Sequence, residues 1–117
     1  MLDIAGWFGP GGLRYQPLTP TRLVDTRTSS PTAPSSPTAV GVGAASVLNV
    51  TAADATRLGW LAAKPCGATD TSSIVNSAPG ESAANLTVVT PDPAGTVCVS
   101  AYRPTHEVVD LVGQFVP

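Results

Sequence analysis

Short apolar segments, separated by turn-forming residues, run along most of the chain. In Val47-Leu48-Asn49-Val50-Thr51, the side chains of Leu48 and Val50 would face one way along a strand and the other three would face the opposite way. Val and Thr, which favour strands, dominate such segments, and Pro79-Gly80 is a strong turn signal between two of them. The pattern predicts strands at about residues 22–27, 40–51, 57–64, 74–76, 83–90, 96–102 and 107–115.

The spacing of these segments predicts an all-β fold. With 12 prolines and 11 glycines in 117 residues, the chain has little material for long helices and enough length for one domain with a buried core. The expected architecture is an antiparallel β-sandwich of about eight short strands, with a small β-barrel as the alternative. The segments 83–90 and 96–102 are expected to form a hairpin across the turn at 91–95.

One stretch of sequence occurs twice. Residues 2–8, Leu-Asp-Ile-Ala-Gly-Trp-Phe, match residues 109–115, Val-Asp-Leu-Val-Gly-Gln-Phe, at five of seven positions when Leu, Ile and Val are pooled. A period close to the domain length predicts that residues 1–9 are an extra strand resembling the end of a preceding module, with the module itself at 10–117. That strand would lie on its own sheet, pair with a neighbouring chain or stay loose. Alternatively, both copies are ordinary strands of one sheet. The residues of the expected assembly strand are Leu2, Asp3, Ile4, Trp7 and Phe8.

Charged residues are scarce and several lie close together. Only 6 basic and 8 acidic residues occur, and three of them, Arg22, Asp25 and Arg27, fall within one predicted strand. We expect structural ion pairs among them, with an anion-binding or catalytic pair as the alternative. Asp110 is expected to pair with Arg22 or Arg27, so that its loss would leave a buried arginine uncompensated.

Four motifs follow one another along the chain. They are Pro-x-Arg-Leu-x-Asp-Thr-Arg at 20–27, Val-Leu-Asn-Val-Thr at 47–51, Ala-Asn-Leu at 84–86 and Val-Asp-Leu-Val-Gly-Gln-Phe at 109–115. Their order resembles a family of extracellular bacterial β-modules, common in actinobacterial secreted and surface proteins and often found in tandem. The resemblance implies a non-enzymatic surface role and carries over no catalytic residue. The family has a longer segment between the first two motifs, so one or two strands are expected to be lost or replaced here by residues 28–38.

The residues most able to carry chemistry are few. The resembling modules have cysteines at the places of Cys66 and Cys98, which lie 32 residues apart without a metal-type spacing, so we expect a disulfide. No metal or other cofactor is expected, and Asp70 is the one loop carboxylate to inspect for a metal. The sole histidine, His106, is expected to be a surface loop residue. Because the chain also lacks a Gly-x-Ser-x-Gly motif, we do not expect an enzyme.

The charge and hydropathy of the chain argue against two classes of partner, nucleic acid and the membrane interior. A net charge of −2 argues against nucleic acid. No apolar run approaches the roughly 18 residues that cross a membrane, so no membrane span is expected. The start Met1–Ile4 lacks the basic and apolar regions of a signal peptide, which indicates either a removed signal or a protein that never used one, such as a phage virion protein.

We therefore expect a non-catalytic structural or decoration module, located outside the cell on a virion or a bacterial surface. It would dock onto a larger assembly through strand and aromatic contacts, with further copies of itself, capsid proteins or surface-layer proteins as partners. The alternative is a carbohydrate-binding or adhesive module that attaches to cell-wall polysaccharide. The aromatic candidates for a ligand or an interface are Trp60, Tyr15 and Tyr102.

Overall fold

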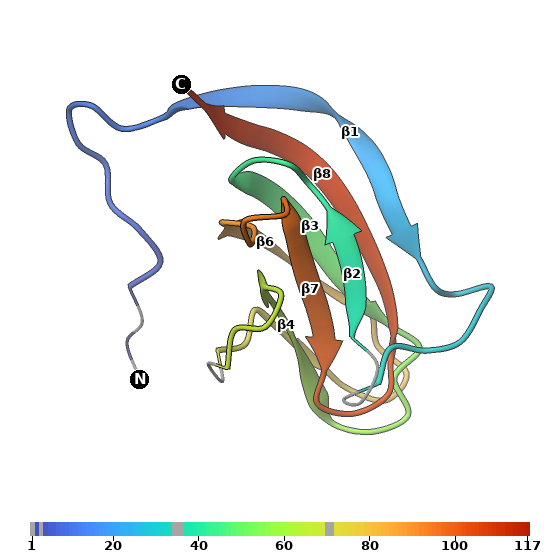
Figure 1. Cartoon of the computed structure of the whole chain (residues 1–117). Helices are drawn as coiled ribbons and strands as arrows, with labels where there is room; N and C mark the ends of the chain where they lie inside the picture. The colour runs from blue at the N-terminus through green and yellow to red at the C-terminus, as the bar shows by residue number, and fades with distance from the viewer. Residues whose placement is uncertain (1, 3, 34–36, 70–71) are drawn as a thin grey trace.

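Two four-stranded antiparallel sheets pack together in a computed structural model that describes residues 2, 4–33, 37–69 and 72–117 (Figure 1). One sheet has the strand order β1-β8-β3-β6 and the other β2-β7-β4-β5. The expected all-β sandwich is confirmed. The strands of the described residues are β1 Arg14–Asp25, β2 Thr38–Gly41, β3 Ser46–Ala53, β4 Gly59–Pro65, β5 Val75–Ser77, β6 Ala83–Val89, β7 Thr96–Ala101 and β8 His106–Val116.

The core lies between the two sheets and is built from small branched side chains. Leu48 and Val50 of β3 are fully buried, whereas Asn49 and Thr51 between and beside them are only partly buried, as the alternation of the sequence predicts. The other large side chains of the core that are completely buried are Leu61, Val97, Val99 and Val109. Each inner sheet face thus supplies alternate residues to one continuous apolar cluster.

Two predictions about the strands are wrong: one expected strand is in fact two, and one expected hairpin does not form. In both places the chain crosses from one sheet to the other. The segment predicted as one strand at 40–51 is β2 and β3, which belong to different sheets. The expected hairpin of 83–90 with 96–102 does not form, because β6 pairs with β3 while β7 pairs with β2 and β4. At both crossings a glycine, Gly43 or Gly95, has a positive φ, 74° and 80°, that other residues rarely adopt.

Hydrogen bonds connect the two segments at which the chain crosses between the sheets, the one between β2 and β3 and the one between β6 and β7. The backbone N–H groups of Val42 and Gly43 both donate to the carbonyl oxygen of Gly95 at 2.9 Å. Within the second crossing, the Asp92 carboxylate accepts hydrogen bonds from the backbone N–H groups of Ala94 and Thr96. These contacts direct β7 onto the opposite sheet instead of back along β6.

The chain before β1 lies outside both sheets. The described residues of 2–9, here called the N-terminal arm, form no strand, and Asp3 lies outside the described residues. The arm arcs away from the start of β1 (Figure 1). Residues 109–115, which carry the matching sequence, lie in β8. The alternative in which both copies are strands of one sheet is therefore wrong for the described part of the chain.

Candidate functional site

The N-terminal arm exposes large apolar side chains to solvent. The exposed fractions of Leu2, Ile4, Trp7 and Phe8 lie between 89% and 97%. A turn at Gly9–Gly12, closed by a 3.3 Å hydrogen bond from the N–H of Gly12 to the carbonyl of Gly9, connects the arm to β1. Four neighbouring apolar side chains with this much exposure are unusual on the surface of a folded protein.

The same sequence in β8 shows what kind of environment such a strand fits. Val109 is completely buried, and the Phe115 ring lies tilted against Tyr15 with 5.5 Å between the ring centroids. The ring of Tyr15 also covers Gly113 so closely that an added Cβ would lie 2.4 Å from its Cε2 atom. A strand of this sequence is therefore held by burial and by an aromatic cover, both of which the N-terminal arm lacks.

The arm approaches one edge of the sandwich. Ile4 and Ala5 line an open hollow of about 420 Å³ together with residues 88–90, 63–65 and Ser72. Two strands border this hollow: β4, which contains residues 63–65, and β6, the edge strand of its sheet, whose Leu86 and Val88 side chains are 57% and 49% exposed. The lining of the hollow is mixed, because polar residues such as Lys64, Ser72 and Thr90 lie beside the apolar ones.

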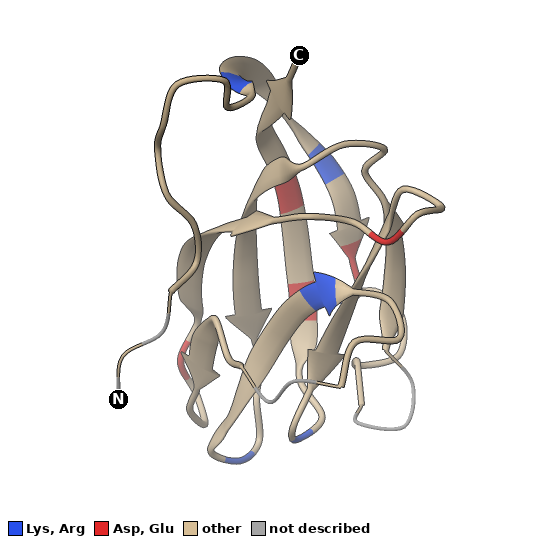
Figure 2. Cartoon of the chain, turned by 60° about the vertical axis from the view of Figure 1, so that its left-hand side comes forward, with Lys and Arg blue, Asp and Glu red and all other residues tan. Residues whose placement is uncertain are grey.

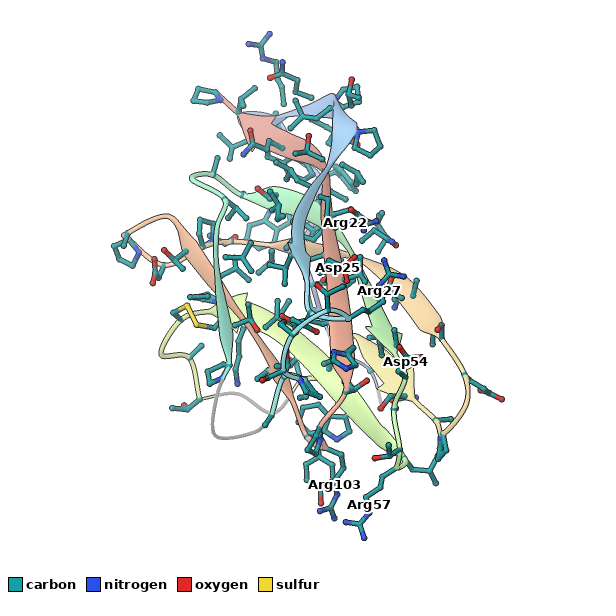
Figure 3. All side chains as sticks on the ribbon, turned by 90° about the vertical axis from the view of Figure 1, so that its right-hand side faces the viewer. Arg22, Asp25, Arg27, Asp54, Arg57 and Arg103 are labelled. Carbon is teal, nitrogen blue, oxygen red and sulfur yellow. A yellow bond between two sulfur atoms is a disulfide. The ribbon has the colours of Figure 1, made fainter. Side chains whose placement is uncertain are left out.

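Three connected salt bridges lie on the outer side of the sandwich (Figure 3). They join Arg22 and Asp25 of β1, Arg27 just after β1, and Asp110 of β8. The Arg22 guanidinium contacts Asp110 of β8 and lies 3.2 Å from Asp25, while Arg27 binds Asp25 with its Nη2 atom at 2.6 Å. The Arg27 side chain and then its backbone N–H, both hydrogen-bonded to Asp25, hold the pKa of that carboxyl well below its usual range.

One expectation about these charges is wrong. Asp110 contacts Arg22, but the Arg22 side chain is 49% exposed and is not buried, because β1 is the outermost strand of its sheet. Water therefore screens the charge if the carboxylate is lost. The Arg22–Asp110 pair connects β1 to β8. Because carboxylates already bind the guanidinium groups of Arg22 and Arg27, these groups are not available to an added anion.

Two of the three aromatic candidates for a ligand or an interface stack on each other. Trp60 of β4 and Tyr102, which follows β7, stack with 5.3 Å between ring centroids and 9° between ring planes. The Arg103 guanidinium lies 4.9 Å from the centroid of the Tyr102 ring. Tyr15 lies apart from this cluster, against Phe115. The structure thus separates the three candidates into one stacked pair and one cover over β8.

The structure also bears on the predicted disulfide, on metal-binding groups and on membrane-spanning helices. The disulfide is present and joins Cys66, just after β4, to Cys98 in β7. The described residues contain no group of three or more His, Cys, Asp or Glu side chains that could hold a metal ion, and Asp70 lies outside them. Over the same described ranges, the structure has no helix long and apolar enough to cross a membrane.

The prediction for His106 is wrong, and the neighbouring Glu107 is a buried carboxyl that the sequence analysis did not single out. His106 is not a surface loop residue: it begins β8, is half-buried, and its Nδ1 atom lies 3.2 Å from the Thr26 hydroxyl. Glu107 is completely buried, and neither carboxyl oxygen makes a hydrogen bond of good geometry. Burial raises the pKa of this carboxyl, and the nearby Thr38 and Thr32 hydroxyls act against that rise. Alternation from Val109 would have placed Glu107 on the core face.

Comparison with known proteins gives no relative: no family model, curated protein or solved structure matches the chain. The functional argument therefore rests on the geometry. The arm exposes apolar side chains beside the hollow at β6 and β4, and the Trp60–Tyr102 stack is a second surface that a ligand or partner could contact. Figure 2 shows how few positions along the ribbon of the sandwich are charged residues.

Proposed function

We propose that this protein is a non-catalytic structural module that docks onto a larger extracellular assembly, such as a phage particle or a bacterial surface, through its N-terminal arm. The observation that carries the proposal is the contrast between two copies of one sequence. In β8 the copy is packed between β1 and β3, whereas in the arm its apolar side chains are 89% to 97% exposed.

Burial of the arm on a partner is energetically favourable. Removing apolar surface from water contributes about 25 cal/mol per Å², and a fully buried Leu, Ile or Phe side chain contributes roughly 1.5–3 kcal/mol. Asp3 is the one charged residue of the sequence 2–9, so a partner must pair its carboxylate or leave it in water for this gain to be kept. Ordering a flexible segment costs free energy, so a partner must bury several of these side chains at once.

An extracellular location agrees with the covalent structure. The Cys66–Cys98 disulfide links the end of β4 to the neighbouring strand β7, and such bonds persist mainly outside the reducing cytosol. A module that works outside the cell gains from this link, because it limits the disorder of the unfolded chain.

The arm can be tested without disturbing the sandwich. In the arm variant, Ile4→Asp with Phe8→Asp, both substituted side chains are almost fully exposed, so the melting temperature should not change. We expect the wild type to self-associate or to be retained on purified bacterial cell envelopes, and the arm variant to lose that binding. If the arm variant equals the wild type in both self-association and retention, the proposal is wrong.

The alternative function, attachment to cell-wall polysaccharide, has one observation in its favour. Tyr102 is about half exposed and has Trp60 and Arg103 beside it, so an aromatic ring and a cation lie together at one end of the sandwich. Aromatic faces and charged donors are groups that bind sugars. Retention on polysaccharide that survives in the arm variant and disappears in Trp60→Ala, at unchanged fold, would favour this alternative.

A further inference from the structure

We infer that the acceptor of the N-terminal arm is the free edge of β6 on a second copy of this chain. The inference rests on the proposed function, in which the arm is a docking segment, and adds the partner and the surface. The contact would be a strand addition, in which an extended segment pairs with the backbone of an exposed sheet edge.

The edges of the two sheets differ in how they are protected. β1 contains Pro17 and Pro20, which have no N–H to donate, and its pairing with β8 is irregular between Pro17 and Thr21. The edge strands of the other sheet, β2 and β5, have only four and three residues. β6 has seven residues and contains neither a proline nor a charged side chain. Among the edge strands of the described residues, β6 is therefore the one that is neither short nor interrupted by proline nor charged, so its edge is the least protected against pairing with another strand.

Only one half of the β6 edge is open. At its first half, the Asn85 side-chain amide donates to the carbonyl of Ile74 at 2.7 Å and its oxygen accepts the backbone N–H of Leu86 at 3.0 Å. The N–H of Leu86 therefore points away from β3. Because N–H groups two residues apart in a strand point the same way, the N–H of Val88 also faces the free edge.

The open half is also the place where the hollow lies. Val88, Val89 and Thr90 line it, and so do Ile4 and Ala5 of the arm. Ile4 is nevertheless 89% exposed, so the arm of the same chain reaches this edge without being buried by it. Leu86 and Val88 lie opposite Asn49 and Val47 of β3 and share the outer face of the sheet, where they offer apolar cover to an added strand.

The tether explains why a second copy is the better donor. The arm leaves the start of β1, swings outward and only then returns to the sandwich (Figure 2). Its own Trp7 and Phe8, which are nearest to this tether, do not line the hollow and are 89% and 97% exposed. An arm from a second copy has no such tether and can lie along the open half of the edge, as in exchange of an identical element between subunits.

A complementation experiment separates donor from acceptor. The arm variant, Ile4→Asp with Phe8→Asp, has an intact β6 edge, whereas Val88→Lys has an intact arm and a charge at the edge. We expect the wild type to self-associate and each variant alone to associate at least about tenfold more weakly, because the contact would have to desolvate a charge. Mixed in equal amounts, the two variants should form a complex that contains one of each.

Controls make each outcome decisive. Leu58→Lys replaces another apolar side chain, 74% exposed and outside the strands, and should associate like the wild type. Leu86→Lys, on the same face as Val88, repeats the test if Val88→Lys melts at a lower temperature. A wild type that stays monomeric at every concentration overturns the inference, while arm-dependent retention on envelopes would still support the proposed function. Self-association that needs the arm but tolerates both lysines also overturns it, because the acceptor then lies elsewhere.

Discussion

At the scale of single residues, Glu107 is the group least suited to its surroundings. Its carboxyl is completely buried at the start of β8 without a well-formed hydrogen bond, and burial raises its pKa. A carboxyl whose folded-state pKa is raised destabilises the folded form as pH rises above its unfolded-state value, about 4.3. Below that pH both states are protonated and the penalty vanishes.

Replacing Glu107 by glutamine should therefore change how stability depends on pH. We expect Glu107→Gln to unfold at the same urea concentration as the wild type at pH 4 and at a higher concentration at pH 8. The difference should correspond to about 1.4 kcal/mol for each unit by which the pKa is raised, until the carboxyl ionises in the folded state. Parallel pH profiles of the two proteins would contradict a raised pKa for this buried carboxyl.

The ion pair of Arg22 with Asp110 should matter much less. Arg22 is half exposed, so Asp110→Ala leaves a cation that water can solvate. We expect a small decrease in the denaturation midpoint at low ionic strength, and a smaller one in about 1 M salt, where charge interactions are screened. A large decrease that persists in salt would show that Arg22 depends on Asp110 in a way its exposure does not indicate.

At the scale of elements, β1 is fixed to β8 by an aromatic cover as well as by charge. The Tyr15 ring lies directly over Gly113, where a side chain of any size would collide with it. Rings that cover glycines on a neighbouring strand recover the packing that the glycine lacks. This contact also explains why β8 has a glycine at a buried position in a long strand.

Gly113→Ala should therefore be destabilising, by about 1–3 kcal/mol, because the new methyl group displaces the Tyr15 ring. The double variant with Tyr15→Ala should lose less than the sum of the two single variants, since the collision is then absent. Gly41→Ala is the matched control, because a Cβ at that position of β2 has open space around it. Additive losses in chemical denaturation would refute the collision.

Some elements could be read from the sequence and others could not. The alternation around Leu48 and Val50 gave the core face of β3 correctly, because a pleated strand with one buried face leaves that trace. The partner of β6 could not be read, since local pattern identifies a strand but not the sheet it joins. That choice depends on the crossing at Asp92 and on two glycines that pack together, Gly43 and Gly95.

The candidate site was likewise only partly visible in the sequence. The match between residues 2–8 and 109–115 singled out the arm, but only the structure shows that the arm is left without cover while β8 is buried. Glu107 went unnoticed because charged residues near strand ends usually face solvent. The role of β6 depends on which strands lie at the sheet edges, and that order follows from the two crossings.

At the scale of the whole molecule, the protein combines a closed sandwich with an apolar segment that the sandwich does not bury. The core is continuous, and the disulfide and the outer ion pairs hold neighbouring strands together. The arm adds nothing to this fold, because its described apolar side chains remain in solvent. A folded domain with such an arm fits the proposed role as one subunit of a larger assembly.

The measurement that tests this account most directly is sedimentation equilibrium of the full chain beside the arm variant, Ile4→Asp with Phe8→Asp, over a wide range of concentrations. The account predicts a wild-type mass that rises with concentration above that of one chain, and an arm variant that remains a monomer with the same melting temperature. Equal monomeric masses at every concentration would contradict assembly of this chain through its arm.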